Sequence, residues 1–516
     1  MFHFIPSWYN EDRTWYDSST VFYRATVNRE FDDTIHQIKL FRSAKEKFNL
    51  FVLNYSPNLR EFLNRHNIYG IDYISVFDVI QNTENINSRL MQINDFLWDE
   101  DVEFVYTPFL IMVLKENKKY ANINFTHTGN IMFIDFFEND VILKKYVMDD
   151  RGFLSSILYY ENGLEKYQEY LNIHGIWQIR EHLQSSKKVE VNEYSDYNFN
   201  KNLYNNIEEL IIEIMNNNIL LEDKIICAAS NINSKILLNN LKNKNVILSF
   251  FENRFNYLDK NILSSSVQKS KILVADTQST YDKLISIIPE EDKNKLNIIT
   301  PYDTRLLLGK SQRKKELIIY LLSDISDKEF LKNIIIKLIK CMEKDSRIHL
   351  CLGTYKKFID EKSLNSIVED ILLYDFEDKY YIKEEDKNSY ENSIDSDEDE
   401  RKALNIKTEI INTELDLIKA LEYTRLIVDL SDYPDVLTSI IGISSGVPQI
   451  NLVNNDYVEN YKNGIIIKDL DELPVAINYY FKGLENWNRS LVYSVEKLLE
   501  YTSSRIVNDW KLLLKD

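Results

Sequence analysis

The chain has 516 residues, which indicates roughly two to four domains at ~100–200 residues each. Its 81 acidic side chains outnumber 62 Lys and Arg, and the formal charge of −19 repels phosphate backbones, which argues against nucleic acid as a main partner. Only 11 Gly and 8 Pro accompany 44% hydrophobic residues, a balance that favours long packed elements over a loop-rich β-sandwich.

Cysteine and histidine positions predict neither disulfides nor a metal site. Cys227, Cys341 and Cys351 lie in apolar surroundings without a Cys-x-x-Cys pair, so we expect buried free thiols in a reducing compartment. His174 and His182 are eight residues apart and do not match a helical i, i+4 metal pair. We therefore expect no metal.

The chain shows no export signal, because "MFHFIPSW" lacks a basic start and a long apolar stretch. The longest apolar run, 104–114, falls short of the ~20 residues that span a bilayer. The sequence therefore predicts a cytoplasmic protein.

Residues 1–118 alternate apolar strand patterns with amphipathic helix patterns. "FHFIPSW" and "LFVLNY" read as strands on either side of "DDTIHQIKLFRSAKEKF", a helix. This βαβ order favours a parallel sheet covered by helices. Four more apolar strand patterns lie within 198–312, so both segments are predicted to form one discontinuous Rossmann-like domain.

Residues 119–197 have another pattern, with turn signals about every ten to twelve residues between runs rich in Tyr, Phe, Ile and Val. Two of these signals are Asp-Asp-Arg-Gly at 149–152 and Asn-Gly at 162–163, and the second favours a hairpin. We predict an antiparallel β-sheet domain inserted into the parallel one.

A second βα series begins near residue 313 and predicts another Rossmann-like domain over 313–480. Within it, 383–401 carries nine acids and almost no large apolar residue, as expected of a solvated loop. Residues 481–516 have the apolar spacing of helices that pack back on the body of the protein.

"GISSG" at 442–446 matches the Gly-x-Ser-x-Gly nucleophile elbow, with Ser444 in the reactive place. That elbow requires a helix after it, whereas "VPQINLV" reads as a strand. The last histidine, His349, also precedes Ser444, against the usual order of such hydrolases. The pattern therefore argues against a hydrolase.

The surrounding frame, "RLIVDLSDYPDVLTSIIGISSGVPQI" followed by "YKNGIIIKDLDELPVAINYYF", resembles the donor domain of retaining GT-B glycosyltransferases. In that family a helix N-terminus and backbone N–H groups hold the donor phosphates, and acids hold the sugar hydroxyls. Gly446 and Pro448 match the Gly-x-Pro turn that precedes a strand.

The family's acids are missing. Its E-x7-E pattern, counted from Gly446, falls on Tyr433 and Ile441, and neither side chain is a carboxylate. Asp432 and Asp435 stand near the first position. The Arg-x4-Lys pair that neutralises the diphosphate in many members falls on Ser323 and Lys328, so only the lysine is kept.

The first loop, "PSWYNEDRTWYDSST", lacks the glycines that often let substrate approach the backbone in GT-B proteins. Its aromatic side chains, Trp8, Tyr9, Trp15 and Tyr16, offer faces on which a sugar ring can stack. The same side chains equally suit packing between the two α/β domains, and both interpretations stay open.

The "MFHFIPSWYNEDRTWYD" opening, the β-rich insert and the acid-free donor frame together resemble the glycosyltransferase-like proteins of the accessory Sec system, nearly end to end. The resemblance implies an α/β, GT-B-like fold of two Rossmann-type domains with an inserted antiparallel β-sheet domain. It also implies a cytosolic complex with two other accessory secretory proteins and the accessory Sec motor ATPase. The resemblance further implies a role in the export of glycosylated serine-rich repeat adhesins, with contact between this chain and the plasma membrane only through its partners.

We therefore predict a protein without catalytic residues, cofactor or metal, which binds partner proteins and contacts the substrate glycan. The alternative is an active retaining glycosyltransferase that uses a nucleotide sugar, with Asp432 or Asp435 as unusual acids. The candidate glycan-contacting residues are Trp8, Tyr9, Tyr433, Asp435, Thr438 and Ser439. The candidate remnants of a donor site are Ser323, Lys328, Ile441, Gly446 and Pro448.

Overall fold

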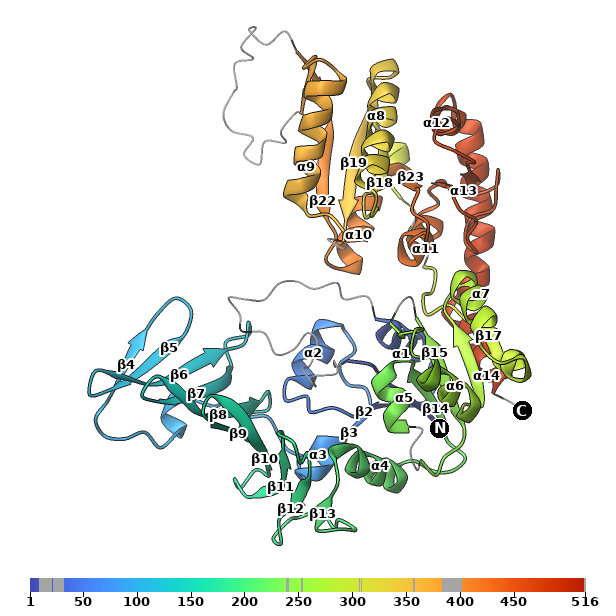
Figure 1. The fold of residues 1–516 in the computed structure, drawn as a ribbon. Helices are drawn as coiled ribbons and strands as arrows, with labels where there is room; N and C mark the ends of the chain where they lie inside the picture. Colours follow the sequence, from blue (N-terminus) through green and yellow to red (C-terminus); the bar gives the residue numbers. More distant parts are fainter. Residues whose placement is uncertain are drawn as a thin grey trace. The chain divides into compact units, whose positions relative to one another are not determined.

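The computed structural model describes residues 1–8, 21, 32–237, 241–251, 254–305, 307, 309–355, 358–382 and 401–514. The chain divides into two compact units, and Figure 1 labels most of their helices and strands. Unit 1 comprises Met1–Asn28, Asp33–Asp276 and Lys283–Ile298, and unit 2 comprises Arg29–Asp32, Thr277–Asp282 and Ile299–Asp516.

Unit 1 is built on a parallel sheet of seven strands in the order β17-β16-β15-β14-β1-β2-β3. The strands are β1 (Phe2–Ile5), β2 (Phe48–Val52), β3 (Tyr73–Ser75), β14 (Lys224–Ala228), β15 (Val246–Phe250), β16 (Ile272–Ala275) and β17 (Leu296–Ile298). The helices are α1 (Asp33–Ser43), α2 (Leu59–Arg65), α3 (Val76–Ile80), α4 (Ile207–Asn218), α5 (Asn231–Leu237) and α6 (Lys260–Lys269), and α7 (Gln278–Ile287) is shared with unit 2. Every residue of β15 and β16 is buried, as the continuous apolar runs predict for a sheet covered on both faces.

Between β3 and β14 the chain forms a ten-stranded antiparallel sheet in which each strand pairs with the next (Figure 1). Its strands are β4 (Val102–Tyr106), β5 (Ile111–Lys115), β6 (Lys118–Phe125), β7 (Ile131–Glu138), β8 (Val141–Asp149), β9 (Phe153–Glu161), β10 (Leu164–Leu171), β11 (Trp177–His182), β12 (Val189–Val191) and β13 (Leu203–Tyr204). The sheet extends beyond the expected range of 119–197 at both ends. The run at 104–114 supplies most of β4 and β5, so the antiparallel pattern begins earlier than the change in sequence style suggests.

Unit 2 is built on six parallel strands in the order β22-β19-β18-β23-β24-β25. They are β18 (Leu317–Leu322), β19 (Ile348–Thr354), β22 (Ile406–Ile410), β23 (Thr424–Asp429), β24 (Gln449–Asn451) and β25 (Gly464–Ile466). The helices are α8 (Lys328–Lys344), α9 (Glu361–Asp370), α10 (Glu414–Leu421), α11 (Val436–Ser445), α12 (Leu473–Phe481), α13 (Leu484–Leu498) and α14 (Ser503–Leu513). A small parallel pair, β20 (Tyr380–Ile382) and β21 (Lys402–Leu404), flanks the predicted acidic loop, of which 383–400 lies outside the described residues.

The C-terminal helices bury large aromatic side chains, as their apolar spacing predicts. Trp487 of α13 is 2% exposed, and its indole N–H donates to the carbonyl of Arg425 in β23 at 2.8 Å. Trp510 of α14 is fully buried. The three cysteines are buried and free, as expected.

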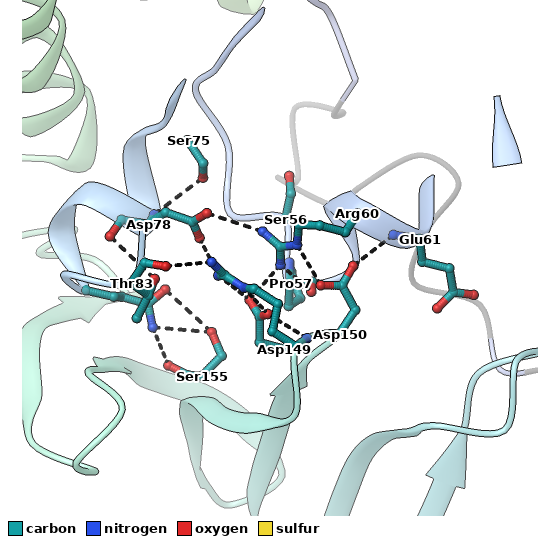
Figure 2. Close-up of polar contacts among 12 residues, drawn as sticks. Ser56, Pro57, Arg60, Glu61, Ser75, Asp78, Thr83, Asp149, Asp150 and Ser155 are labelled. Carbon is teal, nitrogen blue, oxygen red and sulfur yellow. Dashed lines mark hydrogen bonds and ion pairs between the residues drawn. The ribbon is translucent and has the colours of Figure 1, made fainter. Parts of the chain in front are cut away.

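A cluster of five charged side chains, buried or half-buried, links the antiparallel sheet of unit 1 to two helices of its parallel layer, and we call it the arginine joint (Figure 2). It consists of Arg60 in α2, Asp78 in α3, and Asp149, Asp150 and Arg151 at the turn between β8 and β9. Arg60 contacts all three carboxylates, at 3.2 Å to Asp78, 2.8 Å to Asp149 and 2.6 Å to Asp150. Arg151 lies 2.8 Å from Asp78 and 2.7 Å from Asp149.

Backbone groups complete the arginine joint. Arg151 also donates to the Thr83 carbonyl at 2.6 Å, and the Glu61 amide donates to Asp150 at 2.9 Å. Burial would raise the pKa of Asp149, but the charge of Arg60 and the hydrogen bonds of Arg151 hold it below its usual value. Burial raises the pKa of Asp150 to about 6. The joint therefore ties the antiparallel sheet to helices of the parallel layer through paired charges.

Candidate functional site

The carboxyl ends of the strands in unit 2 bring two candidate residues, Asp435 and Thr438, together with three residues that the sequence analysis did not single out. Ligands of open parallel sheets bind at this edge, where the strand order reverses. Here Asp324 follows β18, Tyr355 follows β19, and Asp429 ends β23. Asp435 and Thr438 stand at the start of α11. We call these five residues the Asp435 cluster.

Asp435 is the N-cap of α11, and one of its oxygens, Oδ2, accepts three hydrogen bonds. The donors are the Thr438 amide at 2.9 Å, the Thr438 hydroxyl at 2.8 Å and the Tyr355 hydroxyl at 2.9 Å. An aspartate at this position satisfies amides of the first helical turn and favours the helix dipole. The N-terminus of α11 is therefore occupied by a carboxylate of the chain itself.

Asp429 holds the loop that leads into α11. One carboxylate oxygen accepts from the Ser431 hydroxyl at 2.6 Å, and the other accepts from the Asp435 amide at 2.8 Å. The side chain is buried, and burial raises its pKa to about 6, although these hydrogen bonds oppose the rise. Asp429 thus fixes the backbone of Asp435 rather than facing solvent.

Asp324 holds the neighbouring loop. It is 8% exposed and accepts from the amide of Tyr355 at 2.5 Å. The Thr354 hydroxyl lies 3.2 Å from the same carboxylate and 2.9 Å from the Ile359 carbonyl. Asp324 therefore sets the position from which the Tyr355 ring reaches α11.

Three members of the cluster, Asp324, Tyr355 and Asp429, escaped the sequence analysis. The sequence contains a signal for two of them. Asp429 is the last residue of the buried run "RLIVD", and Asp324 comes directly after "LIIYLLS". Polar residues at the ends of such runs meet at one edge of a parallel sheet. Tyr355 carries no such signal, because its hydroxyl finds its partner 80 residues away in sequence.

The candidate glycan-contacting residues differ in their surroundings. Thr438 and Ser439 are buried, whereas the Tyr433 side chain is 75% exposed. Trp8 belongs to unit 1, is fully buried, and packs on Phe62 with 4.7 Å between ring centroids. A sugar ring could reach Trp8 only after that packing opened. Tyr9, with Trp15 and Tyr16, lies outside the described residues.

The candidate remnants of a donor site lie in different surroundings, and Lys328 is the charged side chain among them. Gly446 ends α11 in the left-handed conformation, at φ 69°, and the Pro448 carbonyl accepts from Ile427 in β23. Ser323 is fully buried, and Ile441 is 4% exposed inside α11. Lys328 is exposed as the first residue of α8.

The Gly-x-Ser-x-Gly match is not a nucleophile elbow. Ser444 lies in the last turn of α11, where its hydroxyl donates to the Ile440 carbonyl at 2.9 Å. The chain then continues into β24 through Gly446, so no helix follows the motif. Within the described ranges no group of three His, Cys, Asp or Glu side chains is arranged to hold a metal ion, and no helix is long and apolar enough to cross a bilayer.

Two Rossmann-type layers, one with an inserted antiparallel sheet, define a GT-B-like protein, and comparison with solved structures confirms this fold. The pneumococcal O-GlcNAc transferase GtfA, solved with UDP and GlcNAc, superposes with a TM-score of 0.67 at 13% identity, covering 100% of this chain and 99% of that one. At that identity the likeness concerns the fold alone.

Sequence comparison gives the family. The model of the accessory Sec system protein family called accessory secretory protein 1 matches residues 1–516, and the chain belongs to this family. The family member from Streptococcus gordonii is 37% identical over 526 residues, covering 100% of this chain and 99% of that protein.

Two solved complexes contain similar chains. In the complex of accessory secretory proteins 1, 2 and 3 from Streptococcus pneumoniae, the matching chain is 34% identical with a TM-score of 0.78, covering 100% of this chain and 99% of that one. In the Glycosylation Associate Protein (Gap123) complex from Streptococcus agalactiae it is 38% identical with a TM-score of 0.75, covering 98% and 99%.

Proposed function

We propose that this chain is a non-catalytic GT-B scaffold of the accessory Sec system, which works in the cytoplasm and aids export of glycosylated serine-rich repeat adhesins. It assembles with two other accessory secretory proteins, binds the accessory Sec motor ATPase, and contacts the glycan of the adhesin. Family membership and the two three-protein complexes of similar chains support the assembly.

One observation carries the non-catalytic part of the proposal: the N-terminus of α11 is capped by the carboxylate of Asp435. In the GT-B frame this helix end is the place for the anionic donor phosphates. Here the Asp435 carboxylate occupies it with three hydrogen bonds of 2.8 to 2.9 Å, one of them from the Tyr355 hydroxyl. A phosphate at the same helix end would be repelled by the negative charge of the Asp435 carboxylate. It would also have to displace this carboxylate from the hydrogen bonds that it already accepts.

The family's acid positions support the same conclusion. Ile441 contributes an apolar side chain to the interior, and Tyr433 stands on an exposed loop. Asp435 is already committed as the helix cap, so it makes a poor substitute acid for a sugar hydroxyl. Asp432 is exposed and remains the acid on which the transferase alternative would have to rely.

The deciding experiment is calorimetric titration of the purified chain with UDP-GlcNAc and UDP-glucose, together with an assay for sugar transfer to a serine-rich repeat peptide. We expect no heat at millimolar donor and no transfer. Asp435→Ser keeps a helix cap but removes the charge, so a gain of weak donor binding in this variant would identify the carboxylate as the barrier. Transfer by the unaltered chain would overturn the proposal in favour of a retaining glycosyltransferase.

The assembly part is tested separately, by co-expression with the two other accessory secretory proteins and with the motor ATPase. We expect each partner to copurify with this chain, and Asp435→Ser to leave copurification unchanged. If none of the partners copurifies with this chain, the scaffold role is refuted, even if the titration shows no heat of donor binding.

A further inference from the structure

A hollow lies at the opposite edge of the unit 2 sheet, at the amino ends of its strands. Its volume is about 250 Å³, and its walls come from the segments that enter β18, β19, β22 and β23 and from the last turn of α10. The floor is apolar, with Ile318, Leu350 and Ile406 among its side chains. The Asp435 cluster stands at the carboxyl ends of the same strands, so the two sites are distinct.

Lysines dominate the charge of this hollow. Lys314, Lys407 and Lys419 line it against one acid, Glu316, in a chain whose net charge is −19. Lys407 pairs with Glu409 at 2.6 Å. Lys314 and Lys419 form no ion pair within the part of the chain that the structure describes. Two ammonium groups therefore face a concave surface without a carboxylate partner.

Aromatic and polar groups complete the walls. The Lys314 ammonium lies 4.5 Å from the centroid of the Tyr423 ring, which holds its long side chain beside the hollow. Asn405 and His349 form the wall between β19 and β22, with 3.1 Å between Asn405 Nδ2 and His349 Nε2. These two side chains add polar groups to the wall. The Lys, Asp and Glu side chains that line the hollow are the three lysines and Glu316.

We propose that this hollow binds a small phosphorylated molecule, with its phosphate on Lys314 and Lys419 and its organic part on the apolar floor. Lysine ammonium groups are compact point charges that suit phosphate. The volume lies just below the ~300–1,000 Å³ of typical ligand pockets, which favours a molecule of sugar-phosphate size over a nucleotide sugar. The proposal concerns a different site from the proposed function and stands independently of it.

Glucose 1-phosphate serves as the probe, with glucose as the uncharged matched ligand, in calorimetric titration of the full chain at low salt. We expect glucose 1-phosphate to bind, glucose not to bind, and added salt to weaken binding, because the contacts are charge–charge contacts. Lys314→Gln and Lys419→Gln are each expected to weaken binding roughly threefold to tenfold, the loss of one charge-assisted contact.

Lys315→Gln is the matched control, because Lys315 is exposed next to Lys314 but does not line the hollow. Both this variant and Asp435→Ser should bind the probe as the unaltered chain does. All lysines concerned are on the surface, and unchanged thermal unfolding of the unliganded variants would verify their folding. Absence of binding at millimolar glucose 1-phosphate, or equal binding by the Lys314→Gln/Lys419→Gln double variant, would overturn the proposal.

Discussion

The arginine joint and the Asp435 cluster each contain three carboxylates, but they satisfy them differently. In the joint, two guanidinium groups lie among Asp78, Asp149 and Asp150, and every carboxylate contacts at least one arginine. In the cluster, Asp429 and Asp435 accept from hydroxyls and backbone amides. Paired charges fix the joint, whereas hydrogen bonds from neutral donors close the cluster.

This difference indicates what each region does. A buried cation–anion network is rigid and costly to break, since removal of one partner leaves an uncompensated charge. Hydroxyl and amide donors around a carboxylate at a helix N-terminus are the groups that would otherwise meet an anionic ligand. We infer that the joint holds the antiparallel sheet in place, and that the cluster covers the N-terminus of α11 with the chain's own side chains.

The largest expected effect comes from breaking the joint. Arg151→Met leaves Asp78 and Asp149 with one guanidinium instead of two and should lower the free energy of unfolding of unit 1 by about 3–5 kcal/mol. Urea unfolding followed by circular dichroism measures the loss. Arg347→Met is the control, because Arg347 forms an exposed pair with Asp345 and its loss should not be measurable. Equal effects of the two variants would contradict the structural role of the joint.

The two positions of the lost acids should respond in opposite ways. Ile441→Glu places a carboxylate in the interior of unit 2 and should destabilise it by about 3 kcal/mol or more, whereas Tyr433→Glu on the exposed loop should leave stability unchanged. Thermal unfolding of both variants tests this. A well-tolerated Ile441→Glu would indicate that position 441 can turn toward solvent and would weaken the case against a donor site.

The pH dependence of stability should separate the cluster from the rest of unit 2. The pKa of Asp429 is raised from 3.8 to about 6, so the folded state holds its proton more tightly than the unfolded chain. This contribution is complete below about pH 4 and is lost as pH rises through 6. Asp429→Asn should therefore flatten the decline between about pH 4 and pH 6 by up to about 1.4 kcal/mol per pH unit. An unchanged slope in urea unfolding at several pH values would refute the assignment to Asp429.

The smallest expected effect concerns two buried tyrosines of the same unit. The Tyr355 hydroxyl contacts Asp435 and Thr438, so Tyr355→Phe should cost about 1–2 kcal/mol. The Tyr320 hydroxyl is buried without a hydrogen-bond partner among the described residues, so Tyr320→Phe should be neutral or slightly stabilising. Denaturant midpoints of the two variants give the comparison, and the reverse order would show that the Tyr355 contact does not hold the cluster closed.

Local sequence patterns were sufficient for the types of element in the fold. The alternating βα pattern predicts both parallel sheets, and Asn162 and Gly163, at φ 52° and 79°, form the hairpin turn between β9 and β10 that their types predict. The extent of the antiparallel sheet was harder to predict. Apolar and polar residues do not alternate strictly in the run at 104–114, so its sequence does not show that it forms strands at the edge of an antiparallel sheet. Pairing with neighbouring strands decides that it does.

The sequence by itself determined that the donor frame lacks its acids, because that conclusion needs only residue types at counted positions such as 433 and 441. It also marked the Asp-Asp-Arg-Gly segment as a turn, since turn chemistry is local. Only the tertiary structure decided that this turn inserts Arg151 between Asp78 and Asp149, and that Tyr355 closes onto Asp435. Such contacts join residues far apart in the chain, and their partners are chosen by the packing of sheets and helices rather than by neighbours in sequence.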